Sequence, residues 1–194
     1  MNRPVSAPAA ARQALRWVFL AMLVLAAVAA PPAWANDIQA AEYRIKAAFL
    51  CKFGNYVEWP SPAAADTPFN IGVLATSAVV DELTAVARGQ MVNGRPIVVR
   101  KLERGDPMDG VDMLFIARTH TARLAETLAA LKDRPVLTVT ETEPGVAIGS
   151  MVNFVIVDDK VKFDISLATV DRSKLRISAR LLGVARTVAG GPPS

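Results

Sequence analysis

The sequence predicts a single α/β domain, a three-layer Rossmann-like sandwich with a mixed sheet and a late β-hairpin followed by a C-terminal helix. Short apolar segments typical of buried strands alternate with segments whose apolar residues recur at helical spacing. Near the C-terminus, two further strand-like segments flank Asp158-Asp159, which indicates a hairpin. Strands joined through helices pair in parallel, whereas the strands of a hairpin are antiparallel. We therefore expect a mixed sheet.

The first 35 residues are typical of a secretory signal peptide. Three arginines and no acidic residue precede a continuous apolar run over Trp17–Ala30, and Ala33-Trp34-Ala35 has the small residues of a cleavage site. An uncleaved membrane anchor is the alternative, but a span needs about 20 apolar residues, which is more than this run provides. We predict cleavage after Ala35, export to the periplasm, and one mature domain over residues 36–194.

The composition argues against nucleic-acid binding and against most catalytic sites. The formal charge of +4 falls to near neutrality once the three leader arginines are removed, so electrostatics gives no basis for binding nucleic acid. Cys51 is the single cysteine, and its place in an apolar helix predicts a buried, unreactive thiol unless it pairs between chains. His120 is the single histidine. With no nucleophile, dinucleotide or Walker motif beside it, we expect no catalytic, metal or cofactor site.

The first element of the mature chain is expected to be a helix over Asp37–Trp59. Its aromatic and aliphatic residues cover one broad arc, and Pro60 ends it. Lys46 is the exception, because it lies inside the apolar arc. The favoured interpretation is snorkelling, in which the lysine stem packs on aromatic rings and the ammonium group reaches water. The alternative is a buried lysine paired with a carboxylate of the sheet, for which Asp164 is one candidate.

The middle of the chain predicts four strands and two helices. The segment DMLFIA is apolar throughout, as expected of a strand that is buried on both faces, and Asn93-Gly94 marks a turn before another strand. Ser77 is expected to cap the first helix, and Thr119 or Thr121 the second. The expected order is strand 69–75, helix 77–87, strand 96–102, strand 112–117, a helix ending at 131, and strand 135–140.

The hairpin is expected to pair residues 151–157 with residues 160–166. A two-residue turn at Asp158-Asp159 brings three apolar pairs onto one face, which supports this register. The pairs are Val152 with Ile165, Phe154 with Phe163, and Ile156 with Val161. A helix over residues 173–188 is expected to follow, and residues 190–194 are expected to form a frayed tail.

Six residues are candidates for contact with a partner or a ligand. Asn153 is expected opposite Asp164, either as an exposed cross-strand pair, which is favoured, or together with Arg180 in a polar cleft. Tyr56 and Trp59 are expected in the core, with an aromatic contact surface as the alternative, because such residues are frequent interface anchors. The sixth candidate is Lys46.

Several segments resemble the YfiR family of exported regulatory proteins, in order along nearly the whole mature chain. They are YRIKAAFLCKFGNYVEWP, FNIGVLA, PVLTVTE, VNFVIVDDKVKFDISLATV and KLRISARLLGVAR. The resemblance implies a periplasmic α/β protein that inhibits an inner-membrane diguanylate cyclase by binding its periplasmic portion, which lowers cyclic di-GMP and restrains biofilm formation. It also implies an outer-membrane-linked partner that sequesters the repressor, and a possible homodimer. The founding member uses disulfides, and because this chain has Cys51 alone, that property is not carried over.

Three function classes follow from these observations. The first is a repressor of a membrane diguanylate cyclase or sensor kinase. The second is a sensor of a small ligand that acts with a histidine kinase or another membrane receptor, and its cleft would lie near the strand ends, where α/β folds bind ligands. The third, a hydrolase, is disfavoured because the sequence has one histidine and no nucleophile motif, and so offers few candidate catalytic residues.

Overall fold

The computed structural model describes residues 33–61, 64, 66–143 and 145–190. The predicted signal sequence and the frayed tail therefore lie almost entirely outside the described residues. The chain divides into residues 1–38 and residues 39–194, and the architecture below is that of the second unit. Within the described part of the chain, no helix is both long enough and apolar enough to cross a membrane.

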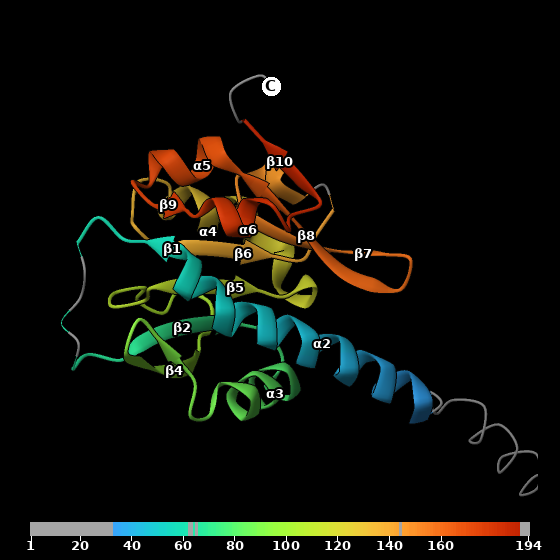
Figure 1. Ribbon diagram of the computed structural model, residues 1–194. Coiled ribbons are helices and arrows are strands. Elements are labelled where there is room, and N and C mark those ends of the chain that lie inside the picture. The colour runs from blue at the N-terminus through green and yellow to red at the C-terminus, as the bar shows by residue number, and fades with distance from the viewer. Residues whose placement is uncertain (1–32, 62–63, 65, 144, 191–194) are drawn as a thin grey trace, which may run out of the picture. The chain divides into compact units, whose positions relative to one another are not determined.

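The centre of the domain is an eight-stranded mixed sheet (Figure 1). Its strand order is β10-β8-β7-β6-β5-β2-β4-β3. The five strands from β7 to β4 are mutually parallel, whereas β8 is antiparallel to β7 and β3 is antiparallel to β4. The edge strand β10 runs parallel to β8, so the predicted mixed α/β fold is confirmed. The strands are β2 (Phe69–Leu74), β3 (Met91–Val92), β4 (Arg95–Lys101), β5 (Met113–Ile116), β6 (Leu137–Thr140), β7 (Val152–Val157), β8 (Lys160–Ser166) and β10 (Thr187–Ala189).

The two faces of this sheet carry separate apolar cores. Successive residues of a strand point to opposite faces, so Ile71 and Val73 belong to one core and Leu74 to the other. Helices α2 (Ala33–Phe53) and α3 (Ser77–Ala87) pack on the first core. Helix α4 (Leu124–Ala130) packs on the second. Helix, sheet and helix form the three predicted layers.

The hairpin of β7 and β8 has the predicted register at every position. Asp158 and Asp159 both take positive φ values, 49° and 56°, as a two-residue primed turn requires. Aspartate tolerates this left-handed region better than most residues, which explains how the turn forms without glycine. Phe154 and Phe163 are buried at the centre of the hairpin, whereas Ile156 near its tip is 46% exposed.

The first helix ends earlier than predicted. Helix α2 stops at Phe53, a 3-10 turn (η1, Gly54–Tyr56) follows, and Val57–Glu58 forms the short strand β1. Gly54 begins this turn close to Val92: a Cβ atom at residue 54 would lie 2.7 Å from both methyl groups of Val92. The backbone becomes extended at Val57, three residues before the proline that was expected to end the helix.

The segment 173–188 is not one helix. After the hairpin come α5 (Leu167–Arg172), β9 (Arg176–Ile177), α6 (Ala179–Leu182) and β10. Lys174, with φ 59°, closes α5, and the amide of Leu175 donates to the carbonyl of Val170 at 3.3 Å. The following residues then pair with β1 and with β8, so tertiary strand pairing replaces the helical pattern of the sequence. The second predicted helix also differs, since it begins as a 3-10 segment, η2 (Arg118–Arg123), before α4.

Candidate functional site

A partly buried group of polar and charged residues lies at the carboxyl ends of β5 and β6. We call Glu42, Tyr43, Lys46, Arg118 and Glu141 the Lys46 cluster. Helix α2 contributes the first three of these residues, Arg118 follows β5, and Glu141 follows β6 directly. Because β5 and β6 are adjacent and parallel, their carboxyl ends meet at one edge of the sheet, and the helix crosses that edge.

Lys46 is the residue around which the Lys46 cluster is arranged. Its side chain is 2% exposed, and its ammonium group donates to Glu42 and to Glu141. Glu141 also accepts from the Tyr43 hydroxyl at 2.6 Å and from the Arg118 amide at 2.8 Å. The Arg118 guanidinium contacts both carboxylates. Two cations balance two carboxylates, which is the condition for burying charges at tolerable cost.

The surroundings of this cluster raise the pKa of two of its members, Tyr43 and Arg118. Burial raises the pKa of the Tyr43 hydroxyl well above its ordinary value, and its hydrogen bond to Glu141 raises it further. Burial alone would lower the pKa of Arg118, but attraction to Glu141 and Glu42 outweighs it, so that pKa is raised. A tyrosine and an arginine held protonated can orient and attract, but neither can act as a base. The cluster therefore acts as a charged tie between α2 and the sheet.

The favoured snorkelling interpretation of Lys46 is wrong, and the paired alternative is confirmed with a different partner. The ammonium group lies 5.0 Å from the centre of the Tyr43 ring and is enclosed by carboxylates rather than water. Glu141 takes the role expected of Asp164. The side chain of Asp164 is instead paired with Arg186, whose Nε lies 2.8 Å from the carboxylate. That hydrogen bond raises the pKa of Arg186, as does the charge of Asp164.

The polar hairpin pair is present in register but does not form one polar site. Asn153 lies opposite Asp164, yet Asn153 is buried rather than exposed, and its side chain bonds Thr140 at 2.7 Å and the amide of Thr142 at 3.0 Å. The preference for an exposed cross-strand pair is therefore wrong. Arg180 is exposed on α6, and no ion pair among the described residues includes it. Arg186, not Arg180, provides the arginine beside Asp164.

Tyr56 and Trp59 are half-buried and pack against the first core, which agrees with the favoured prediction. The indole nitrogen of Trp59 donates to the carbonyl of Pro135 at 2.9 Å, and its ring meets Phe69 edge-on with centroids 5.4 Å apart. Trp59 also lines an open cleft of about 520 Å³. The other lining residues of this Trp59 cleft are Glu58, Pro60, Asp171, Lys174, Leu175 and Arg176.

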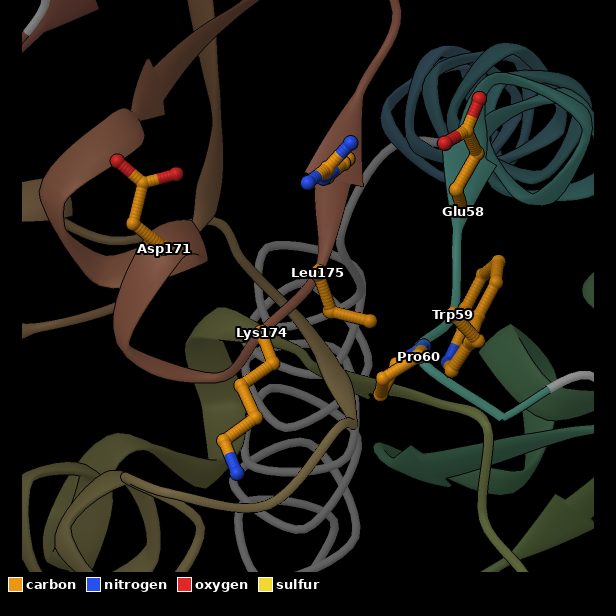
Figure 2. Close-up of a pocket in the computed structure, with 7 residues that line it drawn as sticks. Glu58, Trp59, Pro60, Asp171, Lys174 and Leu175 are labelled. Carbon is orange, nitrogen blue, oxygen red and sulfur yellow. The ribbon is translucent and has the colours of Figure 1, made fainter.

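Figure 2 shows how two distant chain segments form the Trp59 cleft. Glu58, Trp59 and Pro60 come from the β1 strand and the residues after it, and Asp171, Lys174 and Leu175 come from the end of α5 and the residues after it. The antiparallel pairing of β1 with β9 holds the two segments beside each other. Exposed charges of both signs and one aromatic ring line the cleft, and tryptophan is among the residues enriched at protein interfaces.

The sequence analysis missed Glu42, Arg118 and Glu141. Two signals were available: Glu42 stands one helical turn before Lys46, and Glu141 and Arg118 each follow a strongly apolar strand. What was missing was the strand order, which alone places β5 beside β6. Cys51 is buried, as predicted. Among the described residues, no group of three or more histidine, cysteine, aspartate or glutamate side chains is placed to hold a metal ion.

Comparison with known proteins gives one positive result. A model of the YfiR/HmsC-like family matches residues 43–186, which covers the sheet except β10, the Lys46 cluster except Glu42, and the Trp59 cleft. No curated protein matches the chain at a significant level.

Proposed function

The chain belongs to the YfiR/HmsC-like family, and on that premise we propose that it is an exported regulator that binds the periplasmic part of a membrane diguanylate cyclase and inhibits it. The observation that carries this proposal is the family match over residues 43–186, most of the predicted mature chain. Proteins of this family are in general regulatory rather than enzymatic. Inhibition would lower cyclic di-GMP and restrain biofilm formation.

The mechanism we propose is a population shift. A membrane receptor exists in active and inactive conformations, and a protein that binds the inactive one more tightly shifts the balance toward it. Such a repressor needs a stable binding surface and no chemistry. The rigid sheet and the balanced charges of the Lys46 cluster supply that stability.

We propose the Trp59 cleft as the surface that receives the receptor. The Trp59 ring is fixed by its hydrogen bond to Pro135 and by its contact with Phe69, so ordering it on binding costs little entropy. Two exposed cations, Lys174 and Arg176, and two exposed carboxylates, Glu58 and Asp171, line the cleft, so it suits a receptor segment that carries charges of both signs. An outer-membrane-linked partner that occupied the same cleft would relieve repression by competition.

Two measurements test repression and its surface separately. Deletion of the gene is expected to raise cellular cyclic di-GMP, and the purified mature protein is expected to bind the purified periplasmic segment of the cyclase. The charge reversals Lys174→Glu and Arg176→Glu are expected to weaken that binding at least tenfold, a change of about 1.4 kcal/mol. Lys162→Glu is the matched control, because Lys162 is exposed on β8 and does not line the cleft.

The outcomes separate the two parts of the proposal. Unchanged cyclic di-GMP after deletion, together with no binding of the receptor segment, would refute repression. Normal binding by Lys174→Glu and Arg176→Glu would not contradict repression, but it would show that the receptor binds a surface other than the Trp59 cleft.

Export has its own test. N-terminal sequencing of the protein from a periplasmic extract is expected to begin at Asn36. A full-length chain that remains with the membrane fraction would instead establish an uncleaved anchor.

A further inference from the structure

A groove of about 390 Å³ lies along one face of η2 and α4. Its opposite wall is the connection from β4 to β5, which contains no helix between Leu102 and Asp112. Crossovers between parallel strands are usually helical, so an irregular connection leaves a hollow beside α4. The lining residues of this α4 groove are Leu74, Glu103, Arg104, Gly105, Asp106, Met108, His120, Ala122, Arg123, Glu126, Thr127, Ala130, Leu131 and Arg134.

The α4 groove opens at the switch point of the sheet. From β2 the chain continues through α3 to β4 on one side, and β5 lies on the other side of β2 and continues through α4. Helices α3 and α4 pack on opposite faces, so the connections after β2 and β5 separate. Leu74 at the end of β2 and His120 after β5 both line the groove. A crevice at this place is where open α/β sheets bind their ligands.

The floor of the α4 groove is apolar. Leu74 and Leu131 are buried members of the second core, and Met108 packs against the same core. The groove has the volume of a small-molecule site. It is too small for a helix, whose diameter with side chains is about 10–12 Å. An occupant would be a small molecule with an apolar body.

The charged residues on the rim of the α4 groove are mostly paired, and Arg104 is the exception. Glu126 pairs with Arg123 at 3.2 Å, and Arg134 pairs with Asp109 at 2.9 Å. Glu103 pairs with Lys101, and the Asp106 carboxylate accepts the Glu103 amide at 2.9 Å. Thr119 contacts the Nδ1 atom of His120 at 2.9 Å, which leaves the Nε2 atom facing no partner among the described residues. The Arg104 side chain is exposed, and no hydrogen bond or ion pair of the described residues includes it.

We propose that the α4 groove binds a small anion with an apolar body, of the class of medium-chain carboxylates. The apolar body lies on Leu74, Met108 and Leu131, and Arg104 and His120 hold the carboxylate. This site is separate from the Trp59 cleft and shares no lining residue with it. The proposal therefore does not depend on repression of a cyclase.

The test uses hexanoate as the probe. Hexanoate is expected to raise the melting temperature of the mature protein with increasing concentration, because a ligand bound only by the native state stabilises it. It is also expected to shift the NMR methyl signals of Leu74, Met108 and Leu131. Two control compounds each have one of the two required properties: 1-hexanol has the apolar body without the charge, and inorganic phosphate has the charge without the apolar body. Both are expected to bind at least tenfold more weakly than hexanoate.

Variants locate the site. Ala130→Trp fills the groove and is expected to abolish the hexanoate shifts, whereas Ala129→Trp on the neighbouring exposed position does not line it and is the matched control. Arg104→Gln combined with His120→Gln is expected to weaken hexanoate at least tenfold. No methyl shift with hexanoate, or equal shifts in the Arg104→Gln, His120→Gln protein, would overturn the proposal even if Ala130→Trp failed to fold.

Discussion

Lys46 and Glu141 form an ion pair in which both side chains are 2% exposed. The two residues are 95 positions apart in the sequence, and the pair joins α2 to the end of β6. Glu141 has three further contacts, with Tyr43, the Arg118 amide and the Arg118 guanidinium. The stability of the buried Glu141 charge depends on all of these donors.

Lys46→Met is expected to destabilise the protein by about 3 kcal/mol. Removing one partner of a buried pair leaves an uncompensated charge, at a cost of about 3–5 kcal/mol, and the remaining contacts of Glu141 favour the lower end. For a domain of this size the melting temperature should fall by about 6–12 °C. Thermal unfolding checks this value.

A second variant separates charge from packing. Glu141→Gln keeps an oxygen acceptor for Tyr43 and Arg118 but removes the negative charge, so combining it with Lys46→Met should recover part of the loss. Exactly additive losses in the double variant would contradict the ion pair as the source of stability. An unchanged melting temperature in Lys46→Met would do the same.

The raised pKa of the Tyr43 hydroxyl predicts that the folded protein loses stability at alkaline pH. Its pKa in the folded protein is raised by burial and by Glu141, whereas an unfolded tyrosine ionises near pH 10. Above about pH 10 the native state therefore holds a proton that the unfolded state has released, and stability falls as pH rises. Urea unfolding at about pH 8 and about pH 11 is expected to show a steeper loss in wild type than in Tyr43→Phe. Parallel losses in the two proteins would exclude this role for Tyr43.

Cys51 is expected to be unreactive in the folded protein. The side chain is buried, and burial raises the pKa of the thiol to about 11, so little thiolate is present at neutral pH. Iodoacetamide should modify Cys51 only after unfolding in urea. The matched control is Lys52→Cys in a Cys51→Ala background, since residue 52 is the exposed neighbour on the same helix. Equal modification rates in the two native proteins would show that α2 opens readily.

Gly54→Ala is expected to destabilise the protein by about 1–3 kcal/mol through overpacking. The added Cβ would lie 2.7 Å from both methyl groups of Val92 and 3.1 Å from the Phe69 ring. Val92 is buried and β-branched, so it cannot turn both methyl groups away. Gly183→Ala is the control, because its nearest neighbour would be a carbonyl oxygen at 3.4 Å. Equal stability of the two variants, measured by urea unfolding, would show that Val92 can move aside.

The parts of the fold that local rules govern could be predicted from the sequence. The register of the β7–β8 hairpin depends on a two-residue turn and on the alternation of apolar residues, both visible in the sequence. The strand over residues 113–116 could be recognised because burial on both faces demands a continuous apolar run.

Other parts depend on contacts between distant segments. Residues 173–188 have an apolar pattern that suits a helix, yet β9 pairs with β1 and β10 with β8, and neither partner is near in sequence. In the Lys46 cluster, too, one part could be predicted from local pattern and another could not. The helical arc predicted that Lys46 needs a carboxylate if it is buried, but identifying Glu141 required the strand order.

The hydrogen bond from Trp59 to Pro135 gives the molecule an optical reporter. The chain has three tryptophans, Trp17, Trp34 and Trp59, and a protein that begins at Asn36 keeps the last of them. Its indole lines the Trp59 cleft and is bonded to the residue after Arg134, which lines the α4 groove. Tryptophan fluorescence of a protein that begins at Asn36 therefore arises from one defined position. A single emission spectrum can follow both the arrival of a receptor at the cleft and any displacement of the loop after α4, with no label attached.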